Sequence, residues 1–339
     1  MKRKKALITG ISGQDGAYLA KLLLNKGYEV FGGERQNASG NLWRLKELNI
    51  ENKISIIPLE LLEENNINNV IKSEKFHEIY NLAAQSFVHN SYDTPVFTAN
   101  VNALGVARIL ESIRYFSKKT KFYQASTSEM YGNVNSKKQS EKTSFHPVSP
   151  YAISKLYAHW MVNLYRDAYG IFCCSGILFN HESPLRGREF VTKKIVTDLV
   201  KVKFGQLPCL RLGNIYARRD WGYSMDYVEA MWRMMQQKKS DDYVISSGIT
   251  HTIKTFIIKT AKNLDMHLKW EGEGLGEKAI DLKTKKIVVK IDKKYFRPTD
   301  VNVLYGDSAK AKKILKWHPR TNLDELIKIM VEYEIKKYQ

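Results

Sequence analysis

The chain has 339 residues, of which 43% are hydrophobic and 26% are charged. These fractions are close to those of globular proteins and exclude a disordered or fibrous chain, and the length predicts about two domains. Lys and Arg together number 54 against 35 Asp and Glu, which gives a net charge of +19. Because the lysines are spread over the whole chain and are not concentrated on one helix or tail, we expect no nucleic-acid partner.

Cysteines, histidines and apolar runs limit the compartment and the kind of site. Only three cysteines occur, and Cys173 and Cys174 are adjacent, so we expect neither a disulfide framework nor a spaced zinc site. His181 and His251 have no third ligand at a useful spacing, and we predict no bound metal. No stretch approaches the roughly 18 uncharged apolar residues that cross a bilayer, and no run is long enough for a signal peptide. We therefore expect a cytoplasmic protein without membrane attachment.

The first 32 residues predict a βαβ unit. A short buried strand over 4–10 is followed by a helix over 17–24, which ends at Gly27, and by a second strand over 28–32. The alternation continues with strands predicted at 54–58, 78–82, 121–126 and 173–178, separated by helices that include 64–73, 99–117 and 153–168. Strands that alternate with helices imply a parallel sheet that is covered on both faces.

After about residue 180 the pattern becomes irregular, with loops rich in Gly, Pro and Arg, until a helical pattern begins over 323–338. We therefore predict an α/β fold, a Rossmann-like doubly wound parallel sheet with a smaller, interleaved α/β C-terminal substrate domain. In this division the nucleotide-binding Rossmann domain comprises residues 1–180 together with about 213–245. Residues 181–339 mainly bind the substrate.

Three glycines follow the first predicted strand, where it turns into the helix. Gly10, Gly13 and Gly16 form a GxxGxxG pattern, in which glycine permits a tight turn and lets backbone amides approach a pyrophosphate. The N-terminus of the following helix adds partial positive charge. The position of the pattern inside a βαβ unit favours dinucleotide binding over a purely structural turn.

The residues after the second strand give mixed evidence on the cofactor. Glu34 suits a free 2′-hydroxyl on the adenosine ribose, whereas Arg35 suits a 2′-phosphate. A pair of solvated loop charges is the remaining alternative. These residues by themselves leave NAD and NADP open.

Tyr151 and Lys155 form a YxxxK motif in a helix-forming stretch. Their i, i+4 spacing puts the phenol and the ammonium on one face of the helix. The ammonium and a cationic nicotinamide both favour the phenolate, whose ordinary pKa is about 10. Tyr151 is therefore a candidate general base for a sugar hydroxyl.

A hydroxyl and a carboxylate stand at the end of a predicted strand. In an extended chain Thr127 and Glu129 point the same way, at the carboxyl end of the strand, where such sheets bind ligands. A carboxylate beside the Tyr–Lys pair supplies an acid/base group that simple alcohol oxidation does not need. It indicates proton removal from carbon and loss of water.

Several segments carry a family resemblance. They are Thr9–Gly16, Ser126–Glu129, Tyr151–Lys155, Leu178–Pro184, Arg219–Gly222 and Tyr295–Pro298. Together they resemble the GDP-mannose 4,6-dehydratase family of the extended short-chain dehydrogenase/reductase superfamily. The glycine turn and the YxxxK motif are common to the superfamily, whereas the segments at 178–184 and 219–222 are more specific.

The resemblance implies a set of site residues. The implied catalytic residues are Thr127, Glu129, Tyr151 and Lys155. The implied cofactor-binding residues are Tyr151 and Lys155 again, with Gly10, Gly13, Gln14, Asp15, Gly16, Arg35, Leu82 and Ala84. The implied substrate-binding residues are Ser86, Asn180, Val191, Lys194, Arg219, Arg297 and Asp300, and Asp300 stands where the family has Glu.

The resemblance also implies an activity. A member of this family is a hydro-lyase that converts GDP-D-mannose to GDP-4-dehydro-6-deoxy-D-mannose and water, with transient reduction of NADP rather than NAD, in the biosynthesis of deoxysugars such as GDP-fucose. A homotetramer or a homodimer is expected. Three alternatives stay open: a dehydratase for another GDP-sugar such as GDP-heptose or GDP-N-acetylglucosamine, a nucleotide-sugar epimerase or dehydrogenase, and a binding protein without turnover.

Overall fold

The computed structural model describes residues 3–35, 41–134, 138–296 and 301–339. Its largest element is a sheet of seven parallel strands in the order β10-β6-β5-β4-β1-β2-β3. These strands are β1 (Lys5–Thr9), β2 (Glu29–Glu34), β3 (Ser55–Pro58), β4 (Glu78–Asn81), β5 (Lys121–Thr127), β6 (Cys173–Leu178) and β10 (Asp242–Ile245). The predicted doubly wound parallel sheet is confirmed, and the bounds of six strands are close to the predicted ones, whereas β10 was not predicted.

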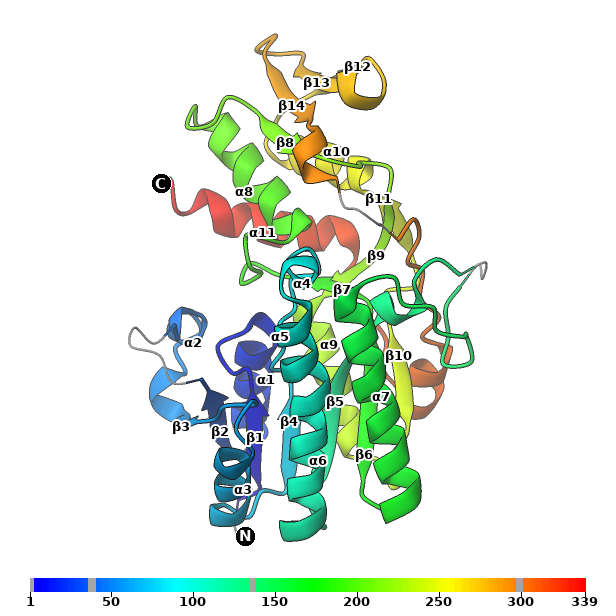
Figure 1. Cartoon of the computed structure of the whole chain (residues 1–339). Helices are drawn as coiled ribbons and strands as arrows, with labels where there is room; N and C mark the ends of the chain where they lie inside the picture. The colour runs from blue at the N-terminus through cyan, green and yellow to red at the C-terminus, as the bar shows by residue number, and fades with distance from the viewer. Residues whose placement is uncertain (1–2, 36–40, 135–137, 297–300) are drawn as a thin grey trace.

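Helices cover both faces of this sheet (Figure 1). One face carries α1 (Gln14–Asn25) and α9 (Ser224–Met235), and the other carries α3 (Glu64–Ser73), α6 (Gly105–Phe116) and α7 (Pro150–Tyr169). Side chains alternate between the faces along each strand, so the adjacent residues Cys173 and Cys174 enter opposite cores. Both cysteines are free and buried.

Shorter helical segments connect these elements. They are α2 (Trp43–Glu47), α4 (Asn90–Asp93), α5 (Pro95–Ala99), the π-helical turns Asn100–Leu104 and Ala311–Leu315, and the 3-10 turns Glu51–Lys53, Ser128–Tyr131, Gly274–Gly276 and Lys293–Tyr295.

A second part of the molecule lies beyond the carboxyl edge of the large sheet, at the top of Figure 1. Here α8 (Val191–Lys203), α10 (Ile253–Asn263) and α11 (Leu323–Ile335) pack around a separate apolar core. One small sheet has the order β11-β9-β7 and another has the order β12-β13-β14-β8. Their strands are β7 (Asn180–Glu182), β8 (Leu210–Leu212), β9 (Arg218–Tyr223), β11 (Thr250–Thr252), β12 (Leu268–Glu271), β13 (Lys278–Asp281) and β14 (Ile287–Ile291).

The expectation of irregular loops after residue 180 is wrong for α8, α9 and α10. In α8 the buried residues Ile195, Val196, Leu199 and Val200 recur at helical spacing, but charged residues between them hide the pattern. The chain also returns to the first part, because β10 pairs with β6 in the large sheet. The two parts are therefore interleaved, while the exact division of residues between two domains stays a prediction.

A charged contact joins the two parts of the molecule. Asp15, in the first turn of α1, lies 2.6 Å from Nε2 of His181 in β7 and accepts a hydrogen bond of 2.6 Å from the hydroxyl of Ser224 in α9. Burial raises the pKa of Asp15, but His181 and Ser224 lower it to about 2. Burial lowers the pKa of His181, but Asp15 raises it above its usual value. Both groups are therefore charged at mildly acidic pH and stabilise the junction.

Replacing Asp15 with Asn should lower the free energy of unfolding by about 2 kcal/mol, the value of a pKa shift of this size. The Asp15 contribution is present above its unfolded pKa and is lost as the pH falls toward about 2. The His181 contribution is present below the unfolded pKa of a histidine, about 6.5, and is lost as the pH rises through the raised folded value. The difference in thermal midpoint between wild type and Asp15→Asn should therefore be largest between about pH 4 and 6.5.

Asp265→Asn is the matched control. Asp265 also stands near a histidine, at 3.9 Å from Nε2 of His267, and lies 3.0 Å from Nζ of Lys283, but all three side chains are mostly exposed. Solvent screens such a pair, so this variant should leave the thermal midpoint unchanged at every pH. Equal shifts for the two variants would contradict the stabilising role of the Asp15 contact.

Candidate active site

The glycine turn leaves no space for side chains at two of its three glycines. Gly10 has φ of +68°, and a Cβ there would lie 2.8 Å from the backbone nitrogen of Ala83. A Cβ on Gly16 would lie 2.3 Å from the carbonyl oxygen of Gly10. The turn lies between β1 and β4, where the strand order reverses, and this is the position at which such sheets bind nucleotides. The backbone at the N-terminus of α1 therefore fits a dinucleotide phosphate.

A cavity of about 580 Å³ opens at this turn. It lies at the carboxyl ends of β1, β4, β5 and β6, and residues of α8, β8 and β9 form its other wall. Most of the predicted site residues line it: Gly10, Gly13, Gln14, Asp15, Gly16, Leu82, Ala84, Ser86, Thr127, Glu129, Tyr151, Lys155, Asn180, Val191, Lys194 and Arg219. Of the described residues predicted for the site, only Arg35 is not among those that line the cavity, and Arg297 and Asp300 lie outside the described residues.

Tyr151 and Lys155 lie one turn apart near the start of α7, and both are buried. Burial raises the pKa of Tyr151, a hydrogen bond from Thr127 lowers it, and the charge of Glu129 raises it further. The resulting pKa is about 12. Burial lowers the pKa of Lys155 to about 8. The Lys155 ammonium lies 5.9 Å from the Tyr151 ring centroid and donates to the carbonyl of Ala125 at 2.9 Å. Lys155 is not among the groups that shift the pKa of the Tyr151 phenol, so the expected lowering by Lys155 is not found.

Thr127 and Glu129 both line the cavity, but not for the predicted reason. The strand ends at Thr127 and a 3-10 turn begins at Ser128, so the backbone between the two residues is not extended. The Glu129 N–H donates to Oγ1 of Thr127 at 3.2 Å, and this bond caps the turn. The Glu129 carboxylate is close enough to Tyr151 to raise the pKa of the phenol.

The opposite wall of the cavity carries cations and an amide. Lys194 lies 3.4 Å above the ring centroid of Tyr295, and burial lowers its pKa. Nη1 of Arg219 donates to the carbonyl oxygens of Arg218 and Val301 at 3.0 and 2.7 Å, which orients the guanidinium. The amide oxygen of Asn180 is buried and has no hydrogen-bond partner within the described part of the chain.

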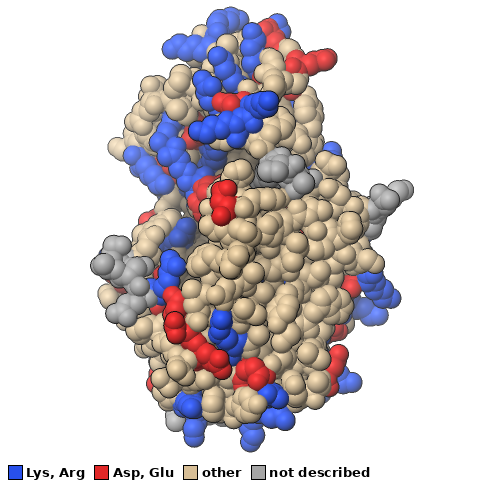
Figure 2. All heavy atoms as spheres, viewed as in Figure 1, with Lys and Arg blue, Asp and Glu red and all other residues tan. Residues whose placement is uncertain are grey.

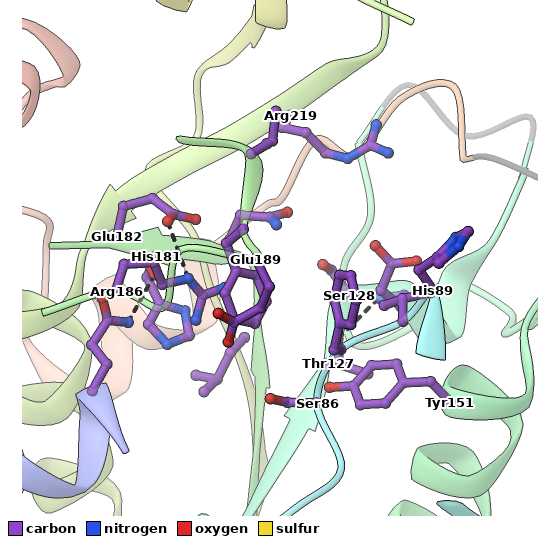
Figure 3. Close-up of a pocket in the computed structure, with 18 of the residues that line it drawn as sticks. Ser86, His89, Thr127, Ser128, Tyr151, His181, Glu182, Arg186, Glu189 and Arg219 are labelled. Carbon is purple, nitrogen blue, oxygen red and sulfur yellow. Dashed lines mark hydrogen bonds and ion pairs between the residues drawn. The ribbon is translucent and has the colours of Figure 1, made fainter. Parts of the chain in front are cut away.

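The cavity is also lined by polar residues that the sequence did not predict for the site, among them His89, His181, Arg186 and Glu189. Figure 3 shows His181, Arg186 and Glu189 on one side of the cavity and Ser86, Thr127 and Tyr151 on the other, with Arg219 above them. Nε of Arg186 lies 3.1 Å from Oε2 of Glu182, and its guanidinium lies 3.5 Å from the ring centroid of Phe190. The specific segment at 178–184 pointed to this wall, since His181 belongs to it and Arg186 follows it closely.

The surface near the cavity is basic. Lys and Arg side chains gather over the upper part of the face in Figure 2, on the side of α8 and the small sheets. Such a field attracts anionic ligands such as nucleotide diphosphates. Among the residues that the structure describes, no group of three or more His, Cys, Asp or Glu side chains is placed to hold a metal ion. In the same residues, no helix is both long and apolar enough to cross a bilayer.

Solved structures share the fold at low sequence identity. The UDP-glucose 4-epimerase of Thermotoga maritima superposes with a TM-score of 0.82 at 23% identity, covering 99% of this chain and 100% of that one. The dTDP-glucose 4,6-dehydratase of Bacillus anthracis superposes with a TM-score of 0.81 at 20% identity, covering 98% and 97%. At this level of identity, the similarity establishes the α/β fold alone.

Sequence similarity to known proteins is much higher. Residues 7–330 match the family described as GDP-mannose 4,6 dehydratase. A GDP-mannose 4,6-dehydratase of Sinorhizobium fredii is 45% identical over 340 residues, which cover 98% of this chain and 97% of that protein. The human GDP-mannose 4,6 dehydratase is 45% identical over 341 residues, which cover 98% and 92%. Both the length of the match and the level of identity show that this chain belongs to the GDP-mannose 4,6-dehydratase family of hydro-lyases.

Proposed function

We propose that this chain removes water from GDP-D-mannose and produces GDP-4-dehydro-6-deoxy-D-mannose. The observation that carries the proposal is the presence of the Glu129 carboxylate in the same cavity as Thr127, Tyr151 and Lys155. Oxidation of an alcohol alone requires one base, which Tyr151 provides. Elimination of water after oxidation requires a second acid/base group, which Glu129 provides.

The proposed roles follow the positions of the side chains. Tyr151 takes the proton of the 4-hydroxyl, and Thr127 holds the phenol by a hydrogen bond. Once carbon 4 is a ketone, its neighbouring hydrogen on carbon 5 is acidic, and Glu129 removes it. Glu129 then gives this proton to the departing 6-hydroxyl, which leaves as water, and Tyr151 returns its own proton to carbon 5. The nicotinamide cofactor, when bound, supplies a hydride acceptor for carbon 4 and a hydride donor for carbon 6.

NADP is the proposed cofactor. The backbone cradle of Gly10 and Gly16 suits a pyrophosphate, as described above. Arg35 directly follows β2 and is exposed, and the carbonyl of Gly33 in the same strand accepts a hydrogen bond of 3.2 Å from Gly10. Arg35 is thus two residues from a direct contact with the glycine turn, where a 2′-phosphate would meet its guanidinium.

GDP-mannose is proposed to lie along the opposite wall. Lys194 and Arg219 suit the diphosphate, because cations that are oriented by their neighbours form charge-assisted hydrogen bonds to phosphate oxygens. Asn180 contributes a buried amide and Val191 an apolar contact at the start of α8, while Ser86 lies near Tyr151 (Figure 3). The roles of Arg297 and Asp300 stay predictions.

Incubation of the protein, loaded with NADP, with GDP-mannose should lower the mass of the sugar nucleotide by about 18 units, one water. Absorbance near roughly 340 nm should show no lasting rise, because the reduced cofactor is consumed in each turnover. Mass spectrometry and absorbance on one sample measure both quantities. Stoichiometric accumulation of reduced cofactor would identify a dehydrogenase, and a product of unchanged mass would identify an epimerase.

Substitution of Glu129 by Gln should separate oxidation from elimination. Gln keeps the size and much of the hydrogen bonding but cannot transfer a proton, so dehydration should fall by about 10²–10⁴-fold. A 4-keto sugar that still bears its 6-hydroxyl, or reduced cofactor, should accumulate. Tyr151→Phe should remove both signals, because no oxidation occurs without deprotonation of the 4-hydroxyl.

Glu332→Gln on the exposed side of α11 makes the same change in charge and should leave turnover unchanged. GDP binding, measured by calorimetry, should persist in Glu129→Gln and Tyr151→Phe, because the proposed diphosphate contacts are on Lys194 and Arg219. Dehydration at the normal rate by Glu129→Gln would refute the proposed role of the carboxylate.

We also propose a homodimer that forms through α7. Four apolar residues of this helix, Ile153, Tyr157, Trp160 and Leu164, are between 43% and 58% exposed. Their spacing of i, i+4, i+7 and i+11 makes one stripe along a 20-residue helix, the pattern by which two helices pack. Val96 and Phe97 of α5 and Leu104 are also exposed. A second copy of this chain, with the same stripe, is a partner that buries all of these side chains at once.

Trp160→Lys combined with Leu164→Lys should convert the dimer into a monomer, because four unpaired charges would enter the two-fold contact. Light scattering after gel filtration measures the mass. Leu282→Lys, which charges a single exposed apolar side chain at the end of β13, is the control and should leave the mass unchanged. A double variant that keeps the wild-type mass would show that α7 is not the contact.

The buried, free cysteines suit the reducing cytoplasm, which we propose as the compartment.

A further inference from the structure

His159 shares the catalytic face of α7. It lies one turn after Lys155 and two turns after Tyr151, so all three side chains project from the same side of the helix toward β5. Lys155 donates to the carbonyl of Ala125 at 2.9 Å, and Nδ1 of His159 lies 3.3 Å from the hydroxyl oxygen of Ser126. The His159 side chain is almost completely buried, and neither the proposed chemistry nor the substrate contacts use it.

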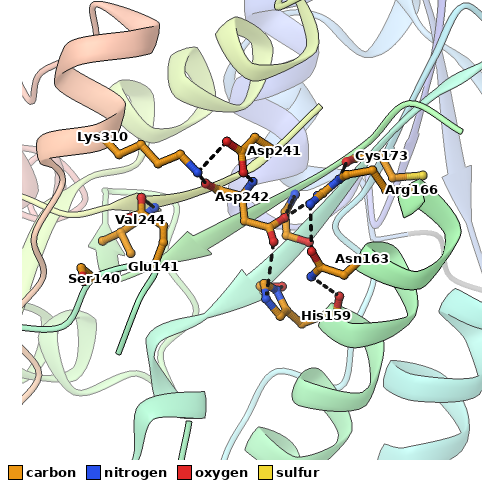
Figure 4. Close-up of polar contacts among 12 residues, drawn as sticks. Ser140, Glu141, His159, Asn163, Arg166, Cys173, Asp241, Asp242, Val244 and Lys310 are labelled. Atoms are coloured by element: carbon orange, nitrogen blue, oxygen red, sulfur yellow. Dashed lines mark hydrogen bonds and ion pairs between the residues drawn. The ribbon is translucent and has the colours of Figure 1, made fainter. Parts of the chain in front are cut away.

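A closed network of polar contacts holds His159 in place (Figure 4). Nε2 of His159 lies 3.7 Å from Oδ2 of Asp242 in β10, and Nη2 of Arg166 donates to Oδ1 of the same carboxylate at 2.5 Å. Nη1 of Arg166 donates to the amide oxygen of Asn163 at 2.8 Å, and the Asn163 amide donates to the backbone carbonyl of His159 at 3.0 Å. The imidazole therefore has a fixed position between β10 and β5.

The surroundings of the ring decide which nitrogen carries the proton. Asp242 accepts hydrogen bonds and donates none when ionised, and its partner Arg166 lowers its pKa although burial raises it. An ionised carboxylate at 3.7 Å from Nε2 favours the tautomer that carries its proton on Nε2. Burial lowers the pKa of His159, against the raising effect of Asp242, so the ring is neutral at neutral pH. Nδ1 is then an acceptor, and the Ser126 hydroxyl donates to it.

We infer that His159 is a positioning residue, which holds the end of β5 against α7 through its hydrogen bond with Ser126. Ser126 directly precedes Thr127, and the turn that carries Glu129 follows. The bond thus sets the distance between the Thr127–Glu129 pair and Tyr151. This inference rests on the proposed function, in which both pairs act on one sugar. It assigns His159 no contact with substrate or cofactor.

Three substitutions at His159 separate positioning from packing. Phe keeps a ring against Phe145 and Trp160, which contact the imidazole edge-on, but has no acceptor for Ser126. Asn puts an amide oxygen near the position of Nδ1 and keeps the acceptor. Gln reaches instead toward the position of Nε2. Turnover of GDP-mannose is measured per folded molecule, with the folded fraction from circular dichroism.

His159→Phe and His159→Gln should lower kcat about tenfold, the effect of losing one buried hydrogen bond in the active state, and leave KM within about twofold of wild type. His159→Asn should keep most of the wild-type kcat. A purely structural role would instead lower the folded fraction in all three variants without changing kcat per folded molecule. Equal kcat in wild type and His159→Phe, or equal loss in all three variants, would overturn the inference.

A double-mutant cycle tests whether His159 acts through Ser126. Ser126→Ala should lower kcat by a similar factor, and the double variant with His159→Phe should lose no more than either single variant. Losses that multiply in the double variant would show that the two residues act independently and would refute the inference.

One measurement is independent of the proposed function. Nitrogen NMR of the imidazole in the cofactor-free protein at neutral pH should show His159 neutral, with its proton on Nε2. In Ser126→Ala the same tautomer should persist, because Asp242 sets it. A proton on Nδ1 would overturn the inference even if dehydration of GDP-mannose is confirmed. Absence of dehydration with the predicted tautomer would refute the proposed function alone.

Discussion

The charged contact between Asp15 and His181 fixes the geometry of the whole cavity. Asp15 belongs to the glycine turn, which holds one wall, and His181 belongs to β7, which begins the other. Two neutral hydrogen bonds reinforce the contact: the Gln14 amide donates to the His181 carbonyl at 3.1 Å and accepts from the Ser183 hydroxyl at 2.6 Å. Because Gly10 and Gly16 are already at the limit of close approach, the turn cannot adjust to a shift of β7. The distance between the two walls therefore depends on a few side chains.

Burial disfavours the charged form of each ionisable group in the site, but its effect on the pKa is exceeded at one of them. It disfavours the ionised forms of both Tyr151 and Lys155, by raising the pKa of the phenol and lowering that of the ammonium. At Asp15 the same cost of burial is exceeded by a cation at 2.6 Å. At neutral pH the Tyr151 phenol is therefore neutral and Lys155 is still mostly an ammonium, whereas Asp15 is ionised at the junction of the two parts.

The order of strands and helices was predictable where the chain repeats one pattern. Buried strands followed by amphipathic helices set the first half, and strands such as 173–178 were placed correctly because apolar runs there are bounded by turns. The helices α8, α9 and α10 were missed because charged residues interrupt their apolar faces and short strands separate them. Tertiary contacts with a second core, rather than local preference, stabilise these segments.

Most of the candidate site residues were also predictable, because motifs mark the positions at which strands end. The position of Glu129 was predicted from an extended backbone, whereas a 3-10 turn brings it to the cavity, and sequence spacing does not reveal such a turn. For His181 the sequence predicted only that it binds no metal. Its pairing with Asp15, 166 positions away, depends on the fold of both parts and has no local signal.

The alternation of side chains along β6 has a practical consequence for studies of unfolding. Cys173 lies in the core beneath α3, α6 and α7, and Cys174 lies in the core beneath α1 and α9. Burial raises the pKa of both thiols, that of Cys174 to about 11, so neither is present as the reactive thiolate in the folded state. Cys209, beside β8, is also buried and free. The rate at which each thiol is labelled therefore reports how often its own part of the interior opens, so two adjacent residues act as separate probes of the two faces of one sheet.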